Sequence, residues 1–179
     1  MNLPNKLTVG RIVCTVFMIA FLRLEGTAFA WLGFAMFGAA ALTDWFDGRI
    51  ARSRNLVTNL GKFMDPLADK ILNYSVMVLL VPEGLIPPVA LVIILFREFL
   101  VSGIRQSGAE QGVVIAANIW GKIKTFFQDV SLAAILLLRA VGVSFLAPMS
   151  NVLIWICAAL TVISGVIYIF QNARVLQEK

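Results

Sequence analysis

Six long stretches of the chain are almost wholly apolar, and short polar segments separate them. These stretches are residues 7–24, 28–50, 62–82, 86–106, 119–140 and 149–172. About 20 helical residues cross a hydrocarbon core of about 30 Å, so each stretch is long enough to do so. Backbone hydrogen bonds must close within each segment in lipid, which favours helices over open strands. The pattern predicts an all-α integral membrane protein with six transmembrane helices.

The composition supports the membrane class. Of the 179 residues, 60% are hydrophobic and only 14% are charged, whereas a soluble domain carries about 25% charged residues. A soluble domain of this size would still expose much of its surface to water, and a bilayer removes that demand. No repeat or long linker divides the sequence, so we expect residues 1–179 to form a single domain.

The basic residues indicate the orientation of the helices. With the N-terminus in the cytoplasm, only Arg23 and Arg139 fall on the opposite side. The cytoplasmic side then holds Lys6, Arg11, Arg49, Arg52, Arg54, Lys62, Arg105, Lys122, Lys124, Arg174 and Lys179. This asymmetry follows the positive-inside rule, so both termini are expected in the cytoplasm. The net charge of +5 is then explained by loops that face anionic lipid rather than by nucleic-acid binding.

The first apolar stretch has an alternative interpretation. Lys6 and Arg11 precede the apolar run 12–22, and Ala28-Phe29-Ala30 resembles a cleavage site. That outline is typical of a secretory signal peptide. Removal of the segment would leave five crossings and would weaken the charge asymmetry, so we interpret the stretch as a helix that stays in the protein.

Four of the five aspartates lie within 26 residues. The stretch reads Asp44-x2-Asp47-Gly48-x2-Ala51-Arg52, then eight residues, then Gly61-x3-Asp65-x3-Asp69. Spacings of three and four place the members of each half on one face of a helix. With residues 50–61 as a cytoplasmic turn, the two helices run antiparallel and all four carboxylates can converge near their cytoplasmic ends.

Four carboxylates at the edge of a bilayer are costly unless cations join them. The chain has no histidine, and a set of oxygen ligands favours Mg²⁺ or Mn²⁺. Two such ions about 4 Å apart suit a displacement at phosphorus. Gly48 and Gly61 leave room for a bulky group such as a nucleotide, although close helix packing also uses glycine. A helix end paired with arginines and a cation pathway through the membrane are the alternatives that the acids alone leave open.

The whole stretch resembles the signature of the CDP-alcohol phosphatidyltransferase family, at all eight fixed positions and both spacings. The resemblance implies a six-helix membrane domain, homodimeric, with a site that opens to the cytoplasm. It implies two divalent cations, Mg²⁺ or Mn²⁺, held by Asp44, Asp47, Asp65 and Asp69. Asp69 would also be the catalytic base for the acceptor hydroxyl, and Arg52 would act near the diphosphate. The CDP moiety would be bound by Asp44, Gly48, Ala51, Arg52 and Gly61.

Three further segments, at 2–11, 97–105 and 112–128, resemble the phosphatidylglycerophosphate synthases of bacteria, a branch of this family. This resemblance implies CDP-diacylglycerol as donor, sn-glycerol 3-phosphate as acceptor and a place in the bacterial cytoplasmic membrane. Inositol phosphate, serine, or phosphatidylglycerol in cardiolipin synthesis stay open as acceptors. A cation transporter subunit is the alternative that is not an enzyme.

Basic residues in the fourth and fifth stretches are candidates to bind an acceptor phosphate. They are Arg97, Arg105, Lys122 and Lys124. The two arginines are eight residues apart and share a helix face, and Arg97 lies about two turns inside its helix, where an unpaired charge is costly. Glu98 follows Arg97 directly and is expected to point elsewhere. For each lysine, contact with anionic headgroups is the alternative, and residues 129–179 carry no motif that indicates a role.

Overall fold

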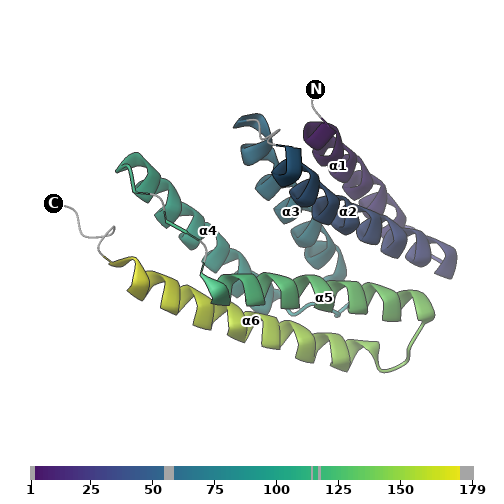
Figure 1. Ribbon diagram of the computed structural model, residues 1–179. Helices are drawn as coiled ribbons and strands as arrows, with labels where there is room; N and C mark the ends of the chain where they lie inside the picture. The colour runs from purple at the N-terminus through teal and green to yellow at the C-terminus, as the bar shows by residue number, and fades with distance from the viewer. Residues whose placement is uncertain (1–2, 55–58, 114, 117, 174–179) are drawn as a thin grey trace. The chain divides into compact units, whose positions relative to one another are not determined.

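The structure, a computed structural model, describes the backbone of residues 3–54, 59–113, 115–116 and 118–173. Side chains are described for residues 8–43 and from 64 onward within those ranges. The described residues form six helices and no strand (Figure 1): α1 Leu3–Leu22, α2 Thr27–Arg54, α3 Asn59–Leu80, α4 Pro88–Glu110, α5 Ile119–Val141 and α6 Leu146–Gln171. The all-α class and the number of helices predicted from the sequence are therefore confirmed.

Several predicted helix ends were wrong by three or four residues, and the ends of α2 and α4 show why. Residues 50–61 were expected to form a turn, but α2 continues to Arg54 and α3 begins at Asn59. Residues 50–54 contain neither glycine nor proline, so nothing in the sequence stops the helix there. Helix α4 likewise extends beyond residue 106 to Glu110 and ends where Gly112 adopts a positive φ of 75°. The Val113 N–H donates to the Gly108 carbonyl at 2.8 Å, which closes the last turn of α4.

The chain groups into two compact units. Unit 1 comprises residues 1–83 with 132–146, and unit 2 comprises residues 84–131 with 147–179. Helix α5 therefore contributes its first half to unit 2 and its last part to unit 1. The single domain expected from the sequence stays a prediction.

In unit 1, α1 packs along α2 and also contacts α3 (Figure 1). Gly33 of α2 lies against Leu22 at the end of α1, and a Cβ at this glycine would come within 2.5 Å of the leucine Cδ2. Met18 and Phe37 are among the buried side chains of α1 and α2, and Leu72 and Met77 are buried on α3. This packing holds α3, whose first half carries part of the acidic stretch, against α1.

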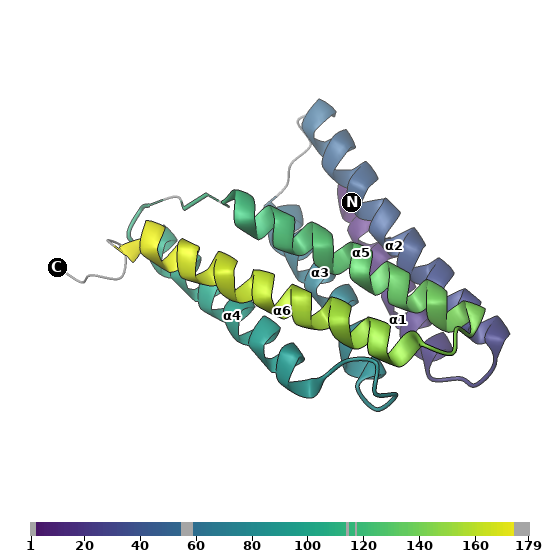
Figure 2. The same ribbon diagram turned by 90° about the horizontal axis from the view of Figure 1, so that it is seen from below.

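In unit 2, α6 lies along α4 and beside the first half of α5 (Figure 2). Val101 and Ile104 of α4 form a buried apolar cluster with Tyr168 of α6. Thr161 and Ser164, which are fully buried on α6, donate their hydroxyl protons to carbonyls of their own helix at 2.7 and 3.0 Å. The polar groups of α6 are thus satisfied locally, as a low-dielectric surrounding requires.

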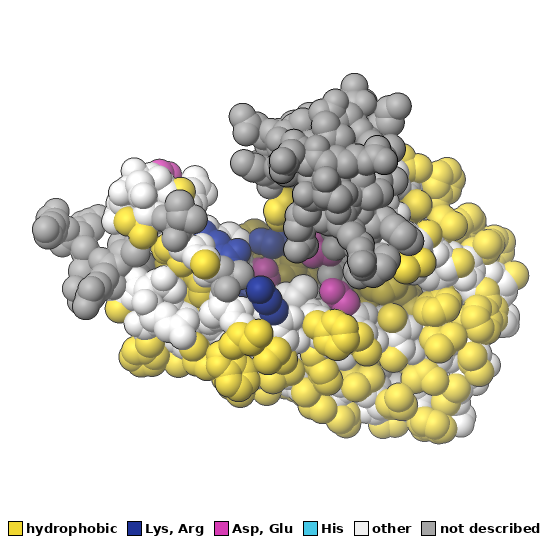
Figure 3. Space-filling model, viewed as in Figure 1, with side chains coloured by type: hydrophobic (Ala, Val, Ile, Leu, Met, Phe, Trp, Pro, Cys, Tyr) yellow, Lys and Arg dark blue, Asp and Glu magenta, His cyan; other side chains and the backbone are white. Residues whose placement is uncertain are grey.

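Hydrophobic side chains cover much of the described surface that Figure 3 displays. Phe96, Phe99, Phe126 and Phe170 are each more than two-thirds exposed, a pattern that suits a surface facing lipid. Within the described residues, one helix, Leu146–Gln171, is long and apolar enough by itself to cross a membrane. The apolar parts Thr8–Leu22 and Thr27–Thr43 are shorter. Six crossings therefore stay a prediction.

Candidate functional site

The acidic stretch occupies the last part of α2 and the first half of α3. Residues 44–52 of the stretch are helical in α2, and Gly61, Asp65 and Asp69 are helical in α3. The two helices contact each other in unit 1. The side chains of residues 44–63 lie outside the described part of the structure, so the predicted convergence of Asp44 and Asp47 with the other two acids stays a prediction.

Asp65 is held by helix α1. The Thr8 hydroxyl donates to the Asp65 carboxylate, and Arg11 Nη1 donates to the Asp65 carbonyl oxygen at 3.4 Å. Thr8 is 2% exposed and Arg11 is fully buried. Thr8 and Arg11 are three residues apart and so share one helix face. Helix α1 therefore orients the first acid of α3, a role that sequence reasoning did not assign to it. The sequence does contain an indication of this role, because Arg11 is a charged residue within the apolar stretch 7–24 and such a residue needs a polar partner.

Oxygen ligands dominate the predicted metal site. No group of three or more His, Cys, Asp or Glu side chains gathers among the side chains that the structure describes, and Asp44 and Asp47 are outside that set. Asp69 is half-buried one turn beyond Asp65 on α3. A hydrogen bond from a hydroxyl to a carboxylate fixes the carboxylate and leaves its other lone pairs available, as in many metal sites. The Thr8–Asp65 contact therefore fits a hard divalent cation.

A second cluster of charges lies in unit 2, where α4 meets α5. Glu98 Oε1 accepts a hydrogen bond from Arg97 Nη1 at 2.8 Å and another from Lys124 Nζ at 2.7 Å. Arg97 is 8% exposed and Lys124 is 2% exposed. The expectation that Glu98 points away from Arg97 was wrong. An unpaired buried charge is costly, and both side chains are long enough to reach around the helix to each other.

Two glycines flank Arg97. A Cβ at Gly165 of α6 would lie 2.9 Å from Arg97 Cγ, and a Cβ at Gly121 of α5 would lie 3.4 Å from Arg97 Nη2. Arg97 Nε is buried and has no hydrogen-bond partner among the residues that the structure describes. Arg97 is thus closely enclosed by two neighbouring helices and keeps one buried donor that an anion can use.

Arg105 contacts α6. Its Nε donates to the Tyr168 hydroxyl at 3.1 Å, and its guanidinium carbon is 5.6 Å from the centre of the tyrosine ring. Tyr168 is buried, whereas Arg105 is exposed. Sequence reasoning found no role for α6, although Tyr168 is one of only two tyrosines in the chain.

The four predicted basic residues do not share one environment. Arg97 and Lys124 meet at Glu98, and Arg105 lies on the same face of α4 as Arg97. Lys122 is exposed, and its position two residues before Lys124 places it on another side of α5. The structure therefore brings Arg97 and Lys124 together at Glu98, places Arg105 two turns along α4 beside Tyr168, and leaves Lys122 exposed.

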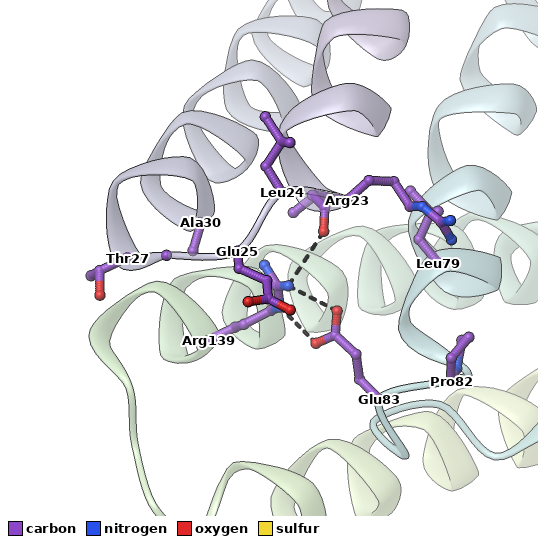
Figure 4. Close-up of a pocket in the computed structure, with 11 residues that line it drawn as sticks. Arg23, Leu24, Glu25, Thr27, Ala30, Leu79, Pro82, Glu83 and Arg139 are labelled. Carbon is purple, nitrogen blue, oxygen red and sulfur yellow. Dashed lines mark hydrogen bonds and ion pairs between the residues drawn. The ribbon is translucent and has the colours of Figure 1, made fainter.

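A pocket of about 570 Å³ lies in unit 1, at the helix ends opposite the acidic stretch. Arg139 donates from Nε and Nη2 to the two carboxylate oxygens of Glu83 at 2.7 and 2.8 Å, and Nη2 also reaches the Leu22 carbonyl at 3.4 Å (Figure 4). This fork joins the α3–α4 turn to α5 and to the end of α1. The pocket is lined by turn residues and lies away from the candidate chemistry.

The model of the CDP-alcohol phosphatidyltransferase family matches residues 1–163. Over 190 residues the chain is 43% identical to the CDP-diacylglycerol–glycerol-3-phosphate 3-phosphatidyltransferase of Bacillus subtilis (strain 168), with 98% of this chain and 97% of the relative covered. The enzyme of the same name from Rickettsia felis is 38% identical over 168 residues, with 93% of each chain covered.

A third relative carries a different name. The cardiolipin synthase (CMP-forming) of Oryza sativa subsp. japonica is 32% identical over 196 residues, which cover 98% of this chain and 59% of the relative. The family match spans most of the sequence, and the first two relatives align nearly from end to end. The chain therefore belongs to the membrane-bound CDP-alcohol phosphatidyltransferase family.

Proposed function

We propose that this protein transfers the phosphatidyl group of CDP-diacylglycerol to sn-glycerol 3-phosphate, giving phosphatidylglycerophosphate and CMP. The observation that carries the proposal is the near full-length identity of 38–43% to enzymes whose names state this donor, this acceptor and this transferred group. Membership of a transferase family also removes the support for a cation transporter.

The proposed setting is the bacterial cytoplasmic membrane, with six transmembrane helices, both termini in the cytoplasm and the site open to the cytoplasm. Each of the six helices has 20 or more residues, which is the length that a bilayer core requires. The distribution of Lys and Arg supports the orientation. We propose a homodimer as well, since the family resemblance implies one.

The family suggests a metal-dependent enzyme. We assign Asp44, Asp47, Asp65 and Asp69 to two divalent cations, Mg²⁺ or Mn²⁺, because the donor set consists of carboxylate oxygens and Thr8 already orients one of them. When bound, such ions supply positive charge that stabilises the developing charge on the oxygens around phosphorus.

The residues of the chain have separable tasks in this reaction. The acceptor hydroxyl oxygen forms a bond to the lipid-linked phosphorus, the bond from that phosphorus to CMP breaks, and Asp69 takes the hydroxyl proton. Arg52 offsets the charge that grows on the departing CMP. Gly48, Ala51 and Gly61 carry small or absent side chains, so they leave space for the CDP moiety beside the helices, and Asp44 completes the set that binds it.

The charge of unit 2 favours a phosphomonoester as acceptor. Glu98 is ion-paired with both Arg97 and Lys124, and the carboxylate of Asp129 also acts on Lys124, so these four groups balance and Arg105 adds one positive charge on the same face of α4. A phosphomonoester has a second pKa near about 6 and is close to a dianion at neutral pH. Serine has no net charge, and phosphatidylglycerol carries one negative charge. Arg105 and the Nε of Arg97, which has no partner among the described residues, therefore offer donors that the phosphate of sn-glycerol 3-phosphate uses fully and that uncharged serine does not.

A second candidate is the synthesis of cardiolipin from phosphatidylglycerol, which the similarity to the rice enzyme supports. The same chain would then use a lipid hydroxyl as nucleophile. Cardiolipin synthesis is the weaker candidate, because the chain is only 32% identical to the rice enzyme and covers only 59% of that relative.

The test uses the purified full-length chain in detergent with CDP-diacylglycerol, Mg²⁺ and one acceptor at a time. We expect CMP release and a phosphatidylglycerophosphate product with sn-glycerol 3-phosphate, and background release with serine, inositol phosphate or phosphatidylglycerol. The Asp69→Asn variant should lose turnover. Release with phosphatidylglycerol alone would replace the first candidate by the second, and full activity of Asp69→Asn would exclude Asp69 as the base.

A further inference from the structure

Helix α6 lies outside every motif of the sequence, yet it contacts Arg97 and Arg105, the two arginines of α4. Gly165 and Tyr168 are three residues apart on one face of α6, and both are buried. Gly165 faces Arg97, and Tyr168 faces Arg105. One helix face thus meets the two basic side chains that α4 presents.

Gly165 determines where the stem of Arg97 can lie. With hydrogen in place of a side chain, Gly165 lets Arg97 pass close to the α6 backbone, whereas a Cβ would stand 2.9 Å from Cγ and 3.9 Å from Nε of the arginine. A distance below 3.0 Å forces the arginine to shift. The stem has somewhere to go, because Arg97 and Gly165 both line an apolar groove of about 400 Å³ between α4 and α6. A substitution at Gly165 therefore displaces the guanidinium rather than preventing α6 from packing.

Tyr168 determines where the guanidinium of Arg105 lies. Its hydroxyl oxygen accepts from Arg105 Nε, and its ring stands 5.6 Å from the guanidinium carbon. Because Nε is occupied in this way, the two terminal nitrogens of Arg105 keep their donors for another partner. The tyrosine itself is fixed by burial among Val101 and Ile104 of α4.

We propose that Gly165 and Tyr168 of α6 are positioning residues for the acceptor, which hold Arg97 and Arg105 in the geometry that binds the phosphate of a phosphomonoester. This inference rests on the proposed function for the identity of that phosphomonoester. It assigns to α6 the preference for a phosphate-bearing alcohol over an uncharged one. Arg97 contributes a buried Nε with no partner among the described residues. An anion in the site would accept a hydrogen bond from this donor and remove the free-energy cost of leaving it unsatisfied.

The experiment compares Gly165→Ala with Gly103→Ala in the full-length enzyme. A Cβ at Gly103 of α4 would have nothing within 4 Å, so this control makes the same chemical change on a helix without a clash. For Gly165→Ala we expect the KM for sn-glycerol 3-phosphate to rise at least about tenfold, because a small misplacement of a binding group is costly. The KM for CDP-diacylglycerol should stay within about twofold, and Gly103→Ala should leave both values near those of the wild type.

Tyr168 is tested with two variants. Tyr168→Phe keeps the ring beside Arg105 and loses only the hydroxyl, and we expect the KM for the acceptor to rise roughly tenfold. Tyr168→Leu also loses the aromatic ring and should raise the KM for the acceptor further. Inhibition by inorganic phosphate should weaken in parallel in all three variants, while thermal unfolding in detergent shows whether each variant is folded. A folded Gly165→Ala enzyme with an unchanged acceptor KM, or an equal rise in the KM of both substrates, would overturn the inference.

Binding of radiolabelled sn-glycerol 3-phosphate without CDP-diacylglycerol separates this inference from the proposed function. Wild-type binding that Gly165→Ala weakens, with no product formed in the complete reaction, would refute the function and uphold the positioning role. Normal turnover of the wild-type enzyme with unchanged KM values in the variants would uphold the proposed function and refute the positioning role. Absence of both binding and turnover in the wild-type enzyme would overturn both.

Discussion

Lys124 Nζ lies 2.7 Å from Glu98 Oε1, and this contact joins α5 to α4 at a point where the lysine side chain is 3% exposed and the glutamate side chain 15%. The same carboxylate oxygen also holds Arg97. Removal of one partner from a buried charge group leaves the others poorly compensated. We therefore expect loss of the Lys124 ammonium to be more costly than loss of an exposed lysine.

Lys124→Met and Lys122→Met form a matched pair on one helix. We expect Lys124→Met to raise the KM for sn-glycerol 3-phosphate at least about tenfold, because a charged hydrogen bond near the acceptor is lost and Glu98 loses a cationic partner. Lys122 is exposed, so Lys122→Met should have a much smaller effect. Steady-state kinetics with each substrate varied in turn measures both. Equal effects of the two variants would place the acceptor away from Glu98.

Thr8→Val should weaken metal binding. The hydroxyl that orients the Asp65 carboxylate is lost while the side-chain volume is kept, and loss of such an orienting partner typically lowers metal affinity about tenfold or more. Free Mn²⁺, measured by electron paramagnetic resonance during a titration, reports the affinity without any need for turnover. Thr8→Ser keeps the hydroxyl and should bind Mn²⁺ as the wild type does. Identical titrations for Thr8→Val and the wild type would show that Asp65 needs no help from α1.

Glu83→Gln should lower stability and leave the kinetics unchanged. The forked pair of Glu83 and Arg139 is partly exposed, with side-chain exposures of 35% and 18%, so we expect a loss of about 1 kcal/mol in the free energy of unfolding. Thermal unfolding in detergent measures the loss. The exchanged pair Glu83→Arg with Arg139→Glu should recover part of it. A changed KM for either substrate would contradict the separation of this contact from the reaction.

Gly33→Ala and Gly38→Ala test the packing of α1 on α2. A Cβ at Gly33 would clash with Leu22 at 2.5 Å, whereas a Cβ at Gly38 would meet nothing within 4 Å. We expect Gly33→Ala to destabilise unit 1 by about 1–2 kcal/mol. Gly38→Ala should be neutral or stabilising by up to about 1 kcal/mol through its helix propensity. Chemical denaturation in mixed micelles compares the two, and the reverse order would mean that Leu22 moves aside freely.

The sequence predicted the helices better than it predicted the contacts between them. Apolar runs located all six helices, and the missing break after residue 50 explains the error at the end of α2. The acids were found because carboxylates within apolar segments are rare and their spacing is specific. Whether the four carboxylates converge cannot be derived from spacing alone, since it depends on how α2 and α3 face each other.

The contacts of Glu98, Gly165 and Tyr168 could not be read from the sequence for a different reason. Helix geometry directs adjacent residues to different sides, but two long charged side chains can still meet when burial makes separation costly, as Arg97 and Glu98 do. A glycine in an apolar helix is ordinarily interpreted as a site of close helix packing, and the side chain that lies against it is known only from the structure. The role of α6 therefore follows from tertiary contacts that no local pattern contains.

The charges that α4 and α5 share also bear on how such a chain enters a membrane. Helix α6 alone has the length and apolar composition of an autonomous span among the described residues, while Arg97, Glu98 and Lys124 lower the hydropathy of the two helices that carry them. A charged residue at the centre of a lone helix costs about 2.5–3.5 kcal/mol during translocon insertion. On the proposed topology, Lys124 of α5 would lack its carboxylate partner in lipid until α5 packs against α4, where Glu98 lies. Biogenesis of unit 2 would thus be cooperative, with the helices integrated as a group rather than one at a time.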